Sequence, residues 1–151
     1  HLRFASPPAP IRRPMSRPIL ATIDLPALRR NLARVRALAG PSRVFAVVKA
    51  DAYGHGLRRV LPALTRADGL ALLDIADAER ARSAGFGGRI LLLEGAFDRD
   101  DWLTAARLGL DVVVHCDEQL AALDALPAGL QLGVFLKLNS GMNRLGFREA
   151  A

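Results

Sequence analysis

The strongest constraint on the fold is an alternation of short, mostly apolar segments with helical segments along most of the chain. The apolar segments are about four to eight residues long, as expected for strands buried on both faces. Five of them begin every twenty or so residues, at positions 44–48, 69–73, 89–93, 111–114 and 131–138. Strands that alternate with helices in this way pair in parallel.

The intervening segments carry helix start signals. Asp24 is placed to cap a helix over residues 25–39, and Pro26 falls in its first turn, where a missing N–H is tolerated. Asp98 and Asp117 are placed to cap later helices. The remaining helices are expected over residues 57–66 and 76–84, and a further strand is expected over residues 19–23.

Two α/β architectures share this pattern, a doubly wound sheet and a (β/α)8 barrel. No Gly-x-Gly-x-x-Gly follows a strand and no P-loop is present, which disfavours the nucleotide-binding doubly wound sheet. A complete barrel needs about 250 residues, whereas this chain has 151. We therefore expect an α/β fold, a partial (β/α)8 TIM barrel with parallel strands that is truncated after about five strands.

The chain divides into two parts by composition. Residues 1–15 are rich in proline and arginine without helical or strand periodicity, so they are expected to form a disordered N-terminal extension. Residues 16–151 are expected to form the incomplete barrel, whose open sheet edges would leave apolar surface uncovered.

The net charge and the amino-acid composition indicate which classes of binding partner the chain is suited to. The net charge of +6 raises nucleic-acid binding as an alternative, but the arginines are scattered and aromatic residues are only 5%, so stacking platforms are lacking. Only weak, non-specific binding to nucleic acid is expected. No apolar run reaches the roughly 18 residues of a membrane span, and the single cysteine, Cys116, fits a reducing cytoplasm.

Only two of the 21 basic residues are lysines, Lys49 and Lys137. A position that keeps lysine among so many arginines is a candidate for an amine that loses its proton and attacks carbon, which a guanidinium does not do. His55 and His115 lack carboxylates at the spacing of a triad or metal site, so no metal is expected.

Lys49 closes an apolar run, and Tyr53, the only tyrosine, follows four residues later. Gly54 and Gly56 then allow close approach of the backbone to a ligand. An amine for an aldehyde beside a hydroxyl for a phosphate suits pyridoxal phosphate (PLP). Judged by its position alone, Lys49 is better explained as a strand-end lysine with its amine in solvent.

The run Val47-Val48-Lys49-Ala50-Asp51-Ala52-Tyr53-Gly54-His55-Gly56 resembles the PLP-attachment signature of the alanine racemases. The resemblance implies that Lys49 forms the Schiff base with PLP and serves as one of two catalytic bases. It implies that Tyr53 contacts the cofactor phosphate.

A second block, residues 137–147, is similar to another signature of the same family. There Arg144 would hydrogen-bond the phenolic oxygen of PLP, and Lys137, often carbamylated in the family, would hold that arginine. Many members have Asp-Thr where this chain has Asn139-Ser140, which leaves the carbamylation of Lys137 less certain than the fold.

The resemblance covers residues 16–148 and implies a cytoplasmic, homodimeric enzyme that interconverts L-alanine and D-alanine for peptidoglycan. In the family a tyrosine from the partner's C-terminal β domain serves the opposite face of the substrate, and no residue of this chain matches it. We therefore expect this chain to be an incomplete fragment that is inactive alone as a racemase.

Three alternatives stay open. The first is another barrel PLP enzyme, either a broad-specificity amino-acid racemase or a decarboxylase, although decarboxylases lack the Tyr-Gly-His-Gly run. The second is a non-catalytic PLP-binding barrel protein. The third is the basic nucleic-acid-binding domain considered above.

Overall fold

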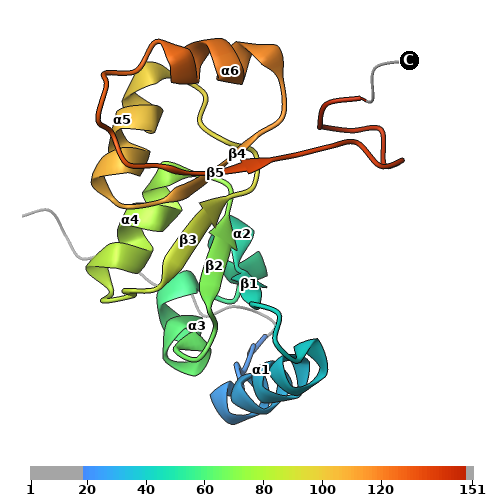
Figure 1. The fold of residues 1–151 in the computed structure, drawn as a ribbon. Helices are drawn as coiled ribbons and strands as arrows, with labels where there is room; N and C mark the ends of the chain where they lie inside the picture. The colour runs from blue at the N-terminus through green and yellow to red at the C-terminus, as the bar shows by residue number, and fades with distance from the viewer. Residues whose placement is uncertain (1–18, 149–151) are drawn as a thin grey trace, which may run out of the picture.

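The computed structural model describes residues 19–148, and its main feature is a sheet of five parallel strands (Figure 1). The strands follow one another across the sheet in chain order, and each neighbouring pair is parallel. They are β1 (Phe45–Val47), β2 (Gly69–Leu72), β3 (Arg89–Leu92), β4 (Asp111–Val114) and β5 (Gly133–Leu136). The five predicted strands are confirmed, most of them shorter by a residue or two at their ends.

Within the described residues the strands alternate with helices. These are α1 (Leu25–Ala39), α2 (Lys49–Tyr53), α3 (Leu57–Leu64), α4 (Ile75–Ser83), α5 (Arg99–Arg107) and α6 (Asp117–Asp124). Helices α3, α4 and α5 lie against one face of the sheet (Figure 1). A doubly wound sheet would carry helices on both faces and would reverse its strand order. The structure therefore confirms the expected partial (β/α)8 barrel.

Two of the three predicted aspartate caps are confirmed. The Asp24 carboxylate accepts a hydrogen bond from the backbone N–H of Ala27, and Asp98 accepts one from Asp101, both at 2.9 Å. The prediction for Asp117 is wrong, because the residue before the first turn of α6 is Cys116. Asp117 lies one position inside the helix, where its charge still stabilises the positive end of the helix dipole.

The predicted strand over residues 19–23 is also wrong. Ile19 and Leu20 are 81% and 88% exposed and form no strand. A strand requires a neighbour, and none of the strands in the described part of the chain lies beside this segment. The predicted disordered extension, residues 1–15, lies outside the described residues.

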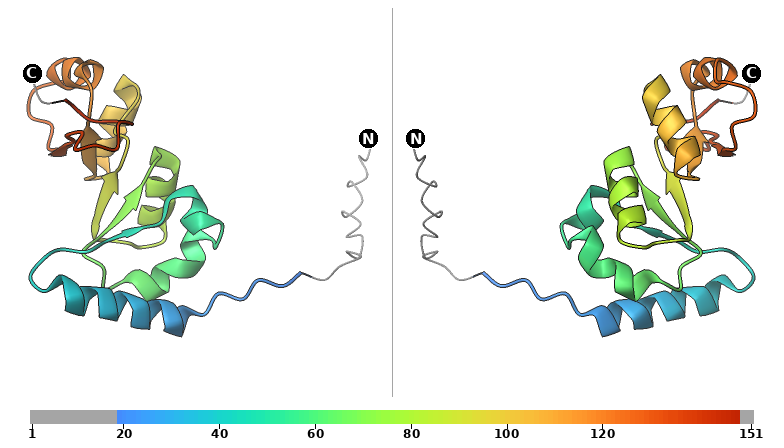
Figure 2. Two further views of the ribbon diagram at one scale, coloured as in Figure 1. Left: turned by 90° about the vertical axis from the view of Figure 1, so that its right-hand side faces the viewer. Right: turned by 90° about the vertical axis from the view of Figure 1, so that its left-hand side faces the viewer.

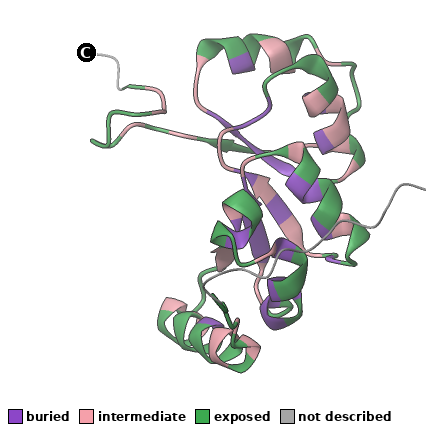
Figure 3. Cartoon of the chain, turned by 180° about the vertical axis from the view of Figure 1, so that it is seen from behind, coloured by how far each residue is buried: buried purple, intermediate pink, exposed green. Residues whose placement is uncertain are grey.

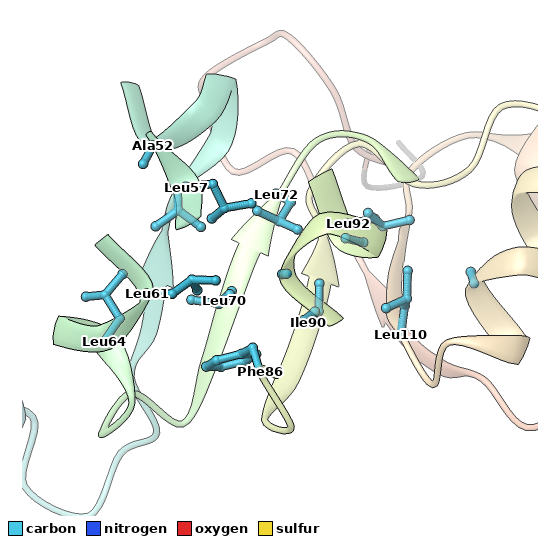
Figure 4. Close-up of a cluster of buried hydrophobic side chains, with 14 of the residues drawn as sticks. Ala52, Leu57, Leu61, Leu64, Leu70, Leu72, Phe86, Ile90, Leu92 and Leu110 are labelled. Atoms are coloured by element: carbon cyan, nitrogen blue, oxygen red, sulfur yellow. The ribbon is translucent and has the colours of Figure 1, made fainter. Parts of the chain in front are cut away.

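The core lies between the sheet and the helices on its outer face. Figure 4 shows Leu57 and Leu61 of α3 facing Leu70 and Leu72 of β2. Burial is concentrated in these layers, whereas α1 is largely exposed (Figure 3) and buries only Leu32. Each fully buried leucine stabilises the fold by roughly 1.5–3 kcal/mol relative to an exposed one.

The other, concave face of the sheet carries a polar cluster near the amino ends of its strands. Arg89 donates two hydrogen bonds of 2.8 Å to the Asp111 carboxylate, which raises the pKa of the guanidinium. Its guanidinium carbon lies 5.6 Å from the centre of the Phe45 ring and 5.5 Å from that of Phe135. A side chain at Gly133 would overlap the Asp111 carboxylate. This cluster fills the amino end of the concave face and leaves the carboxyl end for other groups.

Helix α1 lies beyond the amino end of the sheet (Figure 2) and is joined to it through Asp68. The Asp68 carboxylate accepts a 2.7 Å hydrogen bond from the backbone N–H of Val44 and another of 2.7 Å from Arg36. The Val44 hydrogen bond is the largest cause that lowers the pKa of Asp68 below its ordinary value of 3.8, with partial burial opposing it and Arg36 adding to it.

This shift predicts an acid-dependent loss of stability. Because the pKa of Asp68 is lower in the folded chain than in the unfolded one, its contribution is present above pH 3.8 and is lost as the pH falls through the lowered pKa. We expect Asp68→Asn to flatten the fall in unfolding free energy below pH 3.8, measured by urea unfolding across pH. Asp124→Asn, an exposed change, is the matched control. An unchanged acid profile in Asp68→Asn would contradict this role.

Candidate active site

Lys49 lies where the chain leaves β1. The backbone N–H of the preceding residue, Val48, donates a 3.0 Å hydrogen bond to Ala71 of β2, so the strand ladder continues up to Lys49. Val48 is buried and the Lys49 side chain is half-buried. The structure therefore places Lys49 at the carboxyl end of the sheet, which is where barrel enzymes hold their reactive groups.

Residues 50–53, which make up α2 after Lys49, wind in a left-handed turn and not in a right-handed α-helix. Their φ angles are 52°, 52°, 54° and 56°, although none of the four is glycine. A left-handed conformation costs roughly 1–2 kcal/mol for each such residue. Backbone hydrogen bonds hold the turn, from Ala52 to Val48 at 2.9 Å and from Gly54 to Ala50 at 3.0 Å. Strain of this kind persists only where surrounding contacts fix it, and it clusters at functional sites.

Asp51 connects this turn to the next helix. Its carboxylate accepts a 2.7 Å hydrogen bond from the backbone N–H of Leu57, the first residue of α3. Ala52 and Leu57, 4% and 1% exposed, anchor the two ends of the connection in the core. The sequence reasoning gave Asp51 no role, although an aspartate shortly before a helix is a recognisable capping signal.

Tyr53 ends the left-handed turn, and its side chain is 59% exposed. Gly54 follows with φ of 81°, and a side chain added there would meet nothing within 4 Å. Lys49 and Tyr53 thus lie one turn apart, beside open space. His55 is exposed as well.

Lys137 directly follows β5, the strand at the opposite edge of the sheet from β1. Its side-chain amine donates a 2.7 Å hydrogen bond to the carbonyl oxygen of Leu93, which follows β3. Its backbone N–H donates a 2.9 Å hydrogen bond to Val114 of β4. The half-buried Lys137 therefore joins the carboxyl ends of three neighbouring strands.

Arg144 lies in a loop that begins and ends next to Lys137. The Phe147 N–H donates to the Lys137 carbonyl at 2.9 Å, and the Asn139 N–H donates to the Phe147 carbonyl at 2.8 Å. Arg144 itself is exposed. Over residues 19–148 no hydrogen bond joins the Lys137 amine to Arg144, so the expectation that Lys137 holds Arg144 stays a prediction.

Asn139 organises the same loop through its side chain. Its Oδ1 accepts 3.0 Å hydrogen bonds from the N–H groups of Gly141 and Asn143, and its Nδ2 donates to Asn143 Oδ1 at 2.9 Å. An aspartate carboxylate would accept the first two bonds equally well. Asn139 therefore fulfils the loop-forming role that the carboxylate would have at this position.

The Asn139 geometry predicts unequal effects for two substitutions. Asn139→Asp keeps both acceptor bonds, whereas Asn139→Leu loses them, at about 1 kcal/mol of net stabilisation each. We expect the Gly141 and Asn143 amides to exchange hydrogen roughly tenfold faster in Asn139→Leu and near the unaltered rate in Asn139→Asp. Equal exchange in both variants would contradict the side-chain role.

A groove at the amino end of the sheet lies apart from the four candidate site residues. The groove, of about 450 Å³, lies between α3 and the turn before β3, bordered by Pro62 and Phe86. None of Lys49, Tyr53, Lys137 or Arg144 lines it. In the described residues no group of three or more His, Cys, Asp or Glu side chains could hold a metal ion. None of the helices there combines the length and apolar character needed to cross a membrane.

Comparison with known proteins identifies similarity to alanine racemases. The model of the alanine racemase N-terminal domain matches residues 23–151. The alanine racemase of Variovorax paradoxus is 57% identical over 133 residues, which are 88% of this chain and 36% of that protein. The alanine racemase of Paracidovorax citrulli is 56% identical over 136 residues, which are 90% of this chain and 37% of that protein. The chain thus spans little more than a third of the length of these relatives.

Solved structures agree with the sequences. The biosynthetic alanine racemase of Pseudomonas aeruginosa superposes with a TM-score of 0.79 and 45% identity, covering 83% of this chain and 35% of that one. The alanine racemase of Acinetobacter baumannii gives a TM-score of 0.78 at 38% identity, covering 84% and 39%. The chain therefore belongs to the alanine racemase family, and its residues 23–151 match the N-terminal domain of that family.

Proposed function

We propose that the protein is a PLP-dependent racemase that interconverts L-alanine and D-alanine, with Lys49 as the lysine that holds the cofactor. The observation that carries the proposal is the left-handed turn directly after Lys49. A conformation this costly, repeated over four non-glycine residues, needs a reason beyond packing. Fixing the Lys49 amine and the Tyr53 hydroxyl one turn apart is such a reason.

The chemistry of the available groups fits PLP. Lys49 offers an amine for the aldehyde, and Tyr53 offers an exposed hydroxyl for the phosphate. Arg144 offers an exposed guanidinium for the phenolic oxygen. Open space beside Gly54 and Gly141 lets a ligand approach the backbone there. These groups lie at or beyond the carboxyl ends of parallel strands.

When bound, PLP withdraws electrons from the α-carbon of the amino acid and makes the α-proton removable. Lys49 would attach the cofactor, release it to the incoming amino acid, and then take or return the α-proton at its Nζ on one face. Tyr53 would hold the phosphate. Arg144 would keep the phenolic oxygen ionised and oriented, and a carbamylated Lys137 would accept hydrogen bonds from that guanidinium.

The assignment of one base to this chain has a testable consequence. Proton removal and return on a single face exchange the α-proton without inverting the centre, whereas racemisation requires a second group on the opposite face. We assign that second group to the rest of the longer protein. The complete enzyme would be a homodimer in the cytoplasm that supplies D-alanine for peptidoglycan.

The experiment incubates the chain with PLP and L-alanine in D₂O. We expect deuterium at the α-carbon by NMR, in large excess over D-alanine measured by chiral chromatography, and loss of both in Lys49→Arg. Exchange that persists in Lys49→Arg would contradict the assignment of the base. D-alanine formed as fast as deuterium is incorporated would contradict the single-face assignment. A non-catalytic PLP-binding protein would bind PLP without exchange, and a broad-specificity racemase would exchange larger amino acids as well.

A further inference from the structure

We propose that Gln119 is a positioning residue that fixes the side-chain amine of Lys137 in the candidate site. It acts through the loop after β3, whose Leu93 carbonyl receives that amine. The proposal rests on the role proposed above for Lys137 as the support of Arg144.

Gln119 is a buried polar residue, 7% exposed, on the inner side of α6. Its Nε2 donates hydrogen bonds to the carbonyl oxygens of Glu94, at 2.9 Å, and Ala96, at 3.4 Å. Its Oε1 accepts a 2.9 Å hydrogen bond from the backbone N–H of His115. Both amide protons and the oxygen are therefore engaged, as a buried amide requires. All of these contacts join α6 and the end of β4 to the loop after β3.

His115 and Gly95 also take part in the contact between α6 and the loop after β3. His115 Nε2 lies 3.0 Å from the Glu94 carbonyl oxygen, so this oxygen is held from two side chains. Gly95 has φ of 86°, and a side chain there would overlap the Gln119 amide and press on the Val113 carbonyl. The loop backbone and Gln119 thus fit against each other without spare room.

The Leu93 carbonyl lies inside this restrained segment. On its N-terminal side the Leu93 N–H donates a 2.9 Å hydrogen bond to Leu72, and on its C-terminal side the Glu94 carbonyl is held by Gln119 and His115. These contacts restrain the two residues that flank the Leu93–Glu94 peptide, and so limit how far its backbone moves. The Leu93 carbonyl is therefore held in place beside Lys137, whose amine donates to it at 2.7 Å.

The chain's two lysines make a direct test feasible. Limited acylation with an amine-reactive reagent, followed by peptide mass spectrometry, gives the rates at Lys137 and Lys49 in the same sample. Their ratio cancels differences in reagent and pH. An amine held by a carbonyl reacts more slowly, so release of Lys137 raises the ratio.

We expect Gln119→Leu to raise the Lys137-to-Lys49 ratio roughly tenfold, as loss of a hydrogen bond to a charged group implies. Gln131→Leu, the same change at an exposed position before β5, is expected to leave the ratio unaltered. If Gln119→Leu lacks a cooperative unfolding transition, Gln119→Glu is measured in its place. The carboxylate introduced by that change would keep an acceptor for the His115 N–H but would lose both donors to the loop.

A ratio within about twofold of the unaltered chain in the folded variant would overturn the proposal, because a residue that only stabilises the fold would leave the ratio unchanged. PLP attachment at Lys49 is measured separately. Its absence would refute the proposed function while leaving the effect of Gln119 on Lys137 intact, so the two failures are distinguishable.

Discussion

Replacing Lys49 by alanine is expected to abolish covalent attachment of PLP to the chain. The aldehyde requires an uncharged amine, and Lys49 is the amine at the carboxyl end of β1, half-buried and followed by the left-handed turn. The measurement is the intact mass after incubation with PLP and reduction with borohydride. Lys49→Arg is expected to have the same effect, because a guanidinium keeps the charge but does not condense with the aldehyde.

Lys137→Arg is the matched control, since it makes the same change at the only other lysine. We expect this variant to retain the PLP adduct. If the PLP adduct still forms in Lys49→Ala but is absent in Lys137→Arg, then Lys137 and not Lys49 attaches the cofactor, and the proposed assignment is wrong.

Replacing Trp102 by alanine is expected to destabilise the chain by about 3–5 kcal/mol. Trp102 is 1% exposed and lies in the core where α5 packs on the sheet. Its removal leaves a large cavity in the hydrophobic core. Since a domain of this size is stable by only about 5–15 kcal/mol, the loss should be evident in the urea midpoint.

Leu120→Ala provides the comparison, because Leu120 on α6 is 39% exposed. We expect that change to cost less than about 1 kcal/mol. A loss below about 1.5 kcal/mol in Trp102→Ala would indicate that the site collapses around the missing ring, and would contradict the packing described for α5.

The features predicted correctly from the sequence are those that depend on neighbours in the chain. Asp24 and Asp98 cap helices because the accepting carboxylate and the donating N–H lie three residues apart. The five strands follow from their apolar character and their regular spacing. Residues 19–23 have the same apolar character but no neighbouring strand among the described residues, and a single segment does not reveal whether it has one.

The features missed by sequence reasoning depend on distant contacts or on costly backbone conformations. Among residues 50–53 only Asp51 is of a type that tolerates the left-handed region, and then as a single residue, so a run of four was not predictable. The Lys137 contact spans 44 residues, from β5 to the end of β3. The importance of Gln119 depends on Gly95 lying opposite it, since a buried glutamine and an exposed one look alike in sequence.

Location of PLP on the unaltered chain tests the central claim most directly. The chain is incubated with PLP, reduced with borohydride, digested, and the peptides that contain Lys49, Lys137 and the N-terminal amine are compared by mass. The proposed site predicts that the adduct is found on the Lys49 peptide, with Lys137 left unmodified. An adduct spread evenly over all three amines, or found on Lys137 alone, would contradict it.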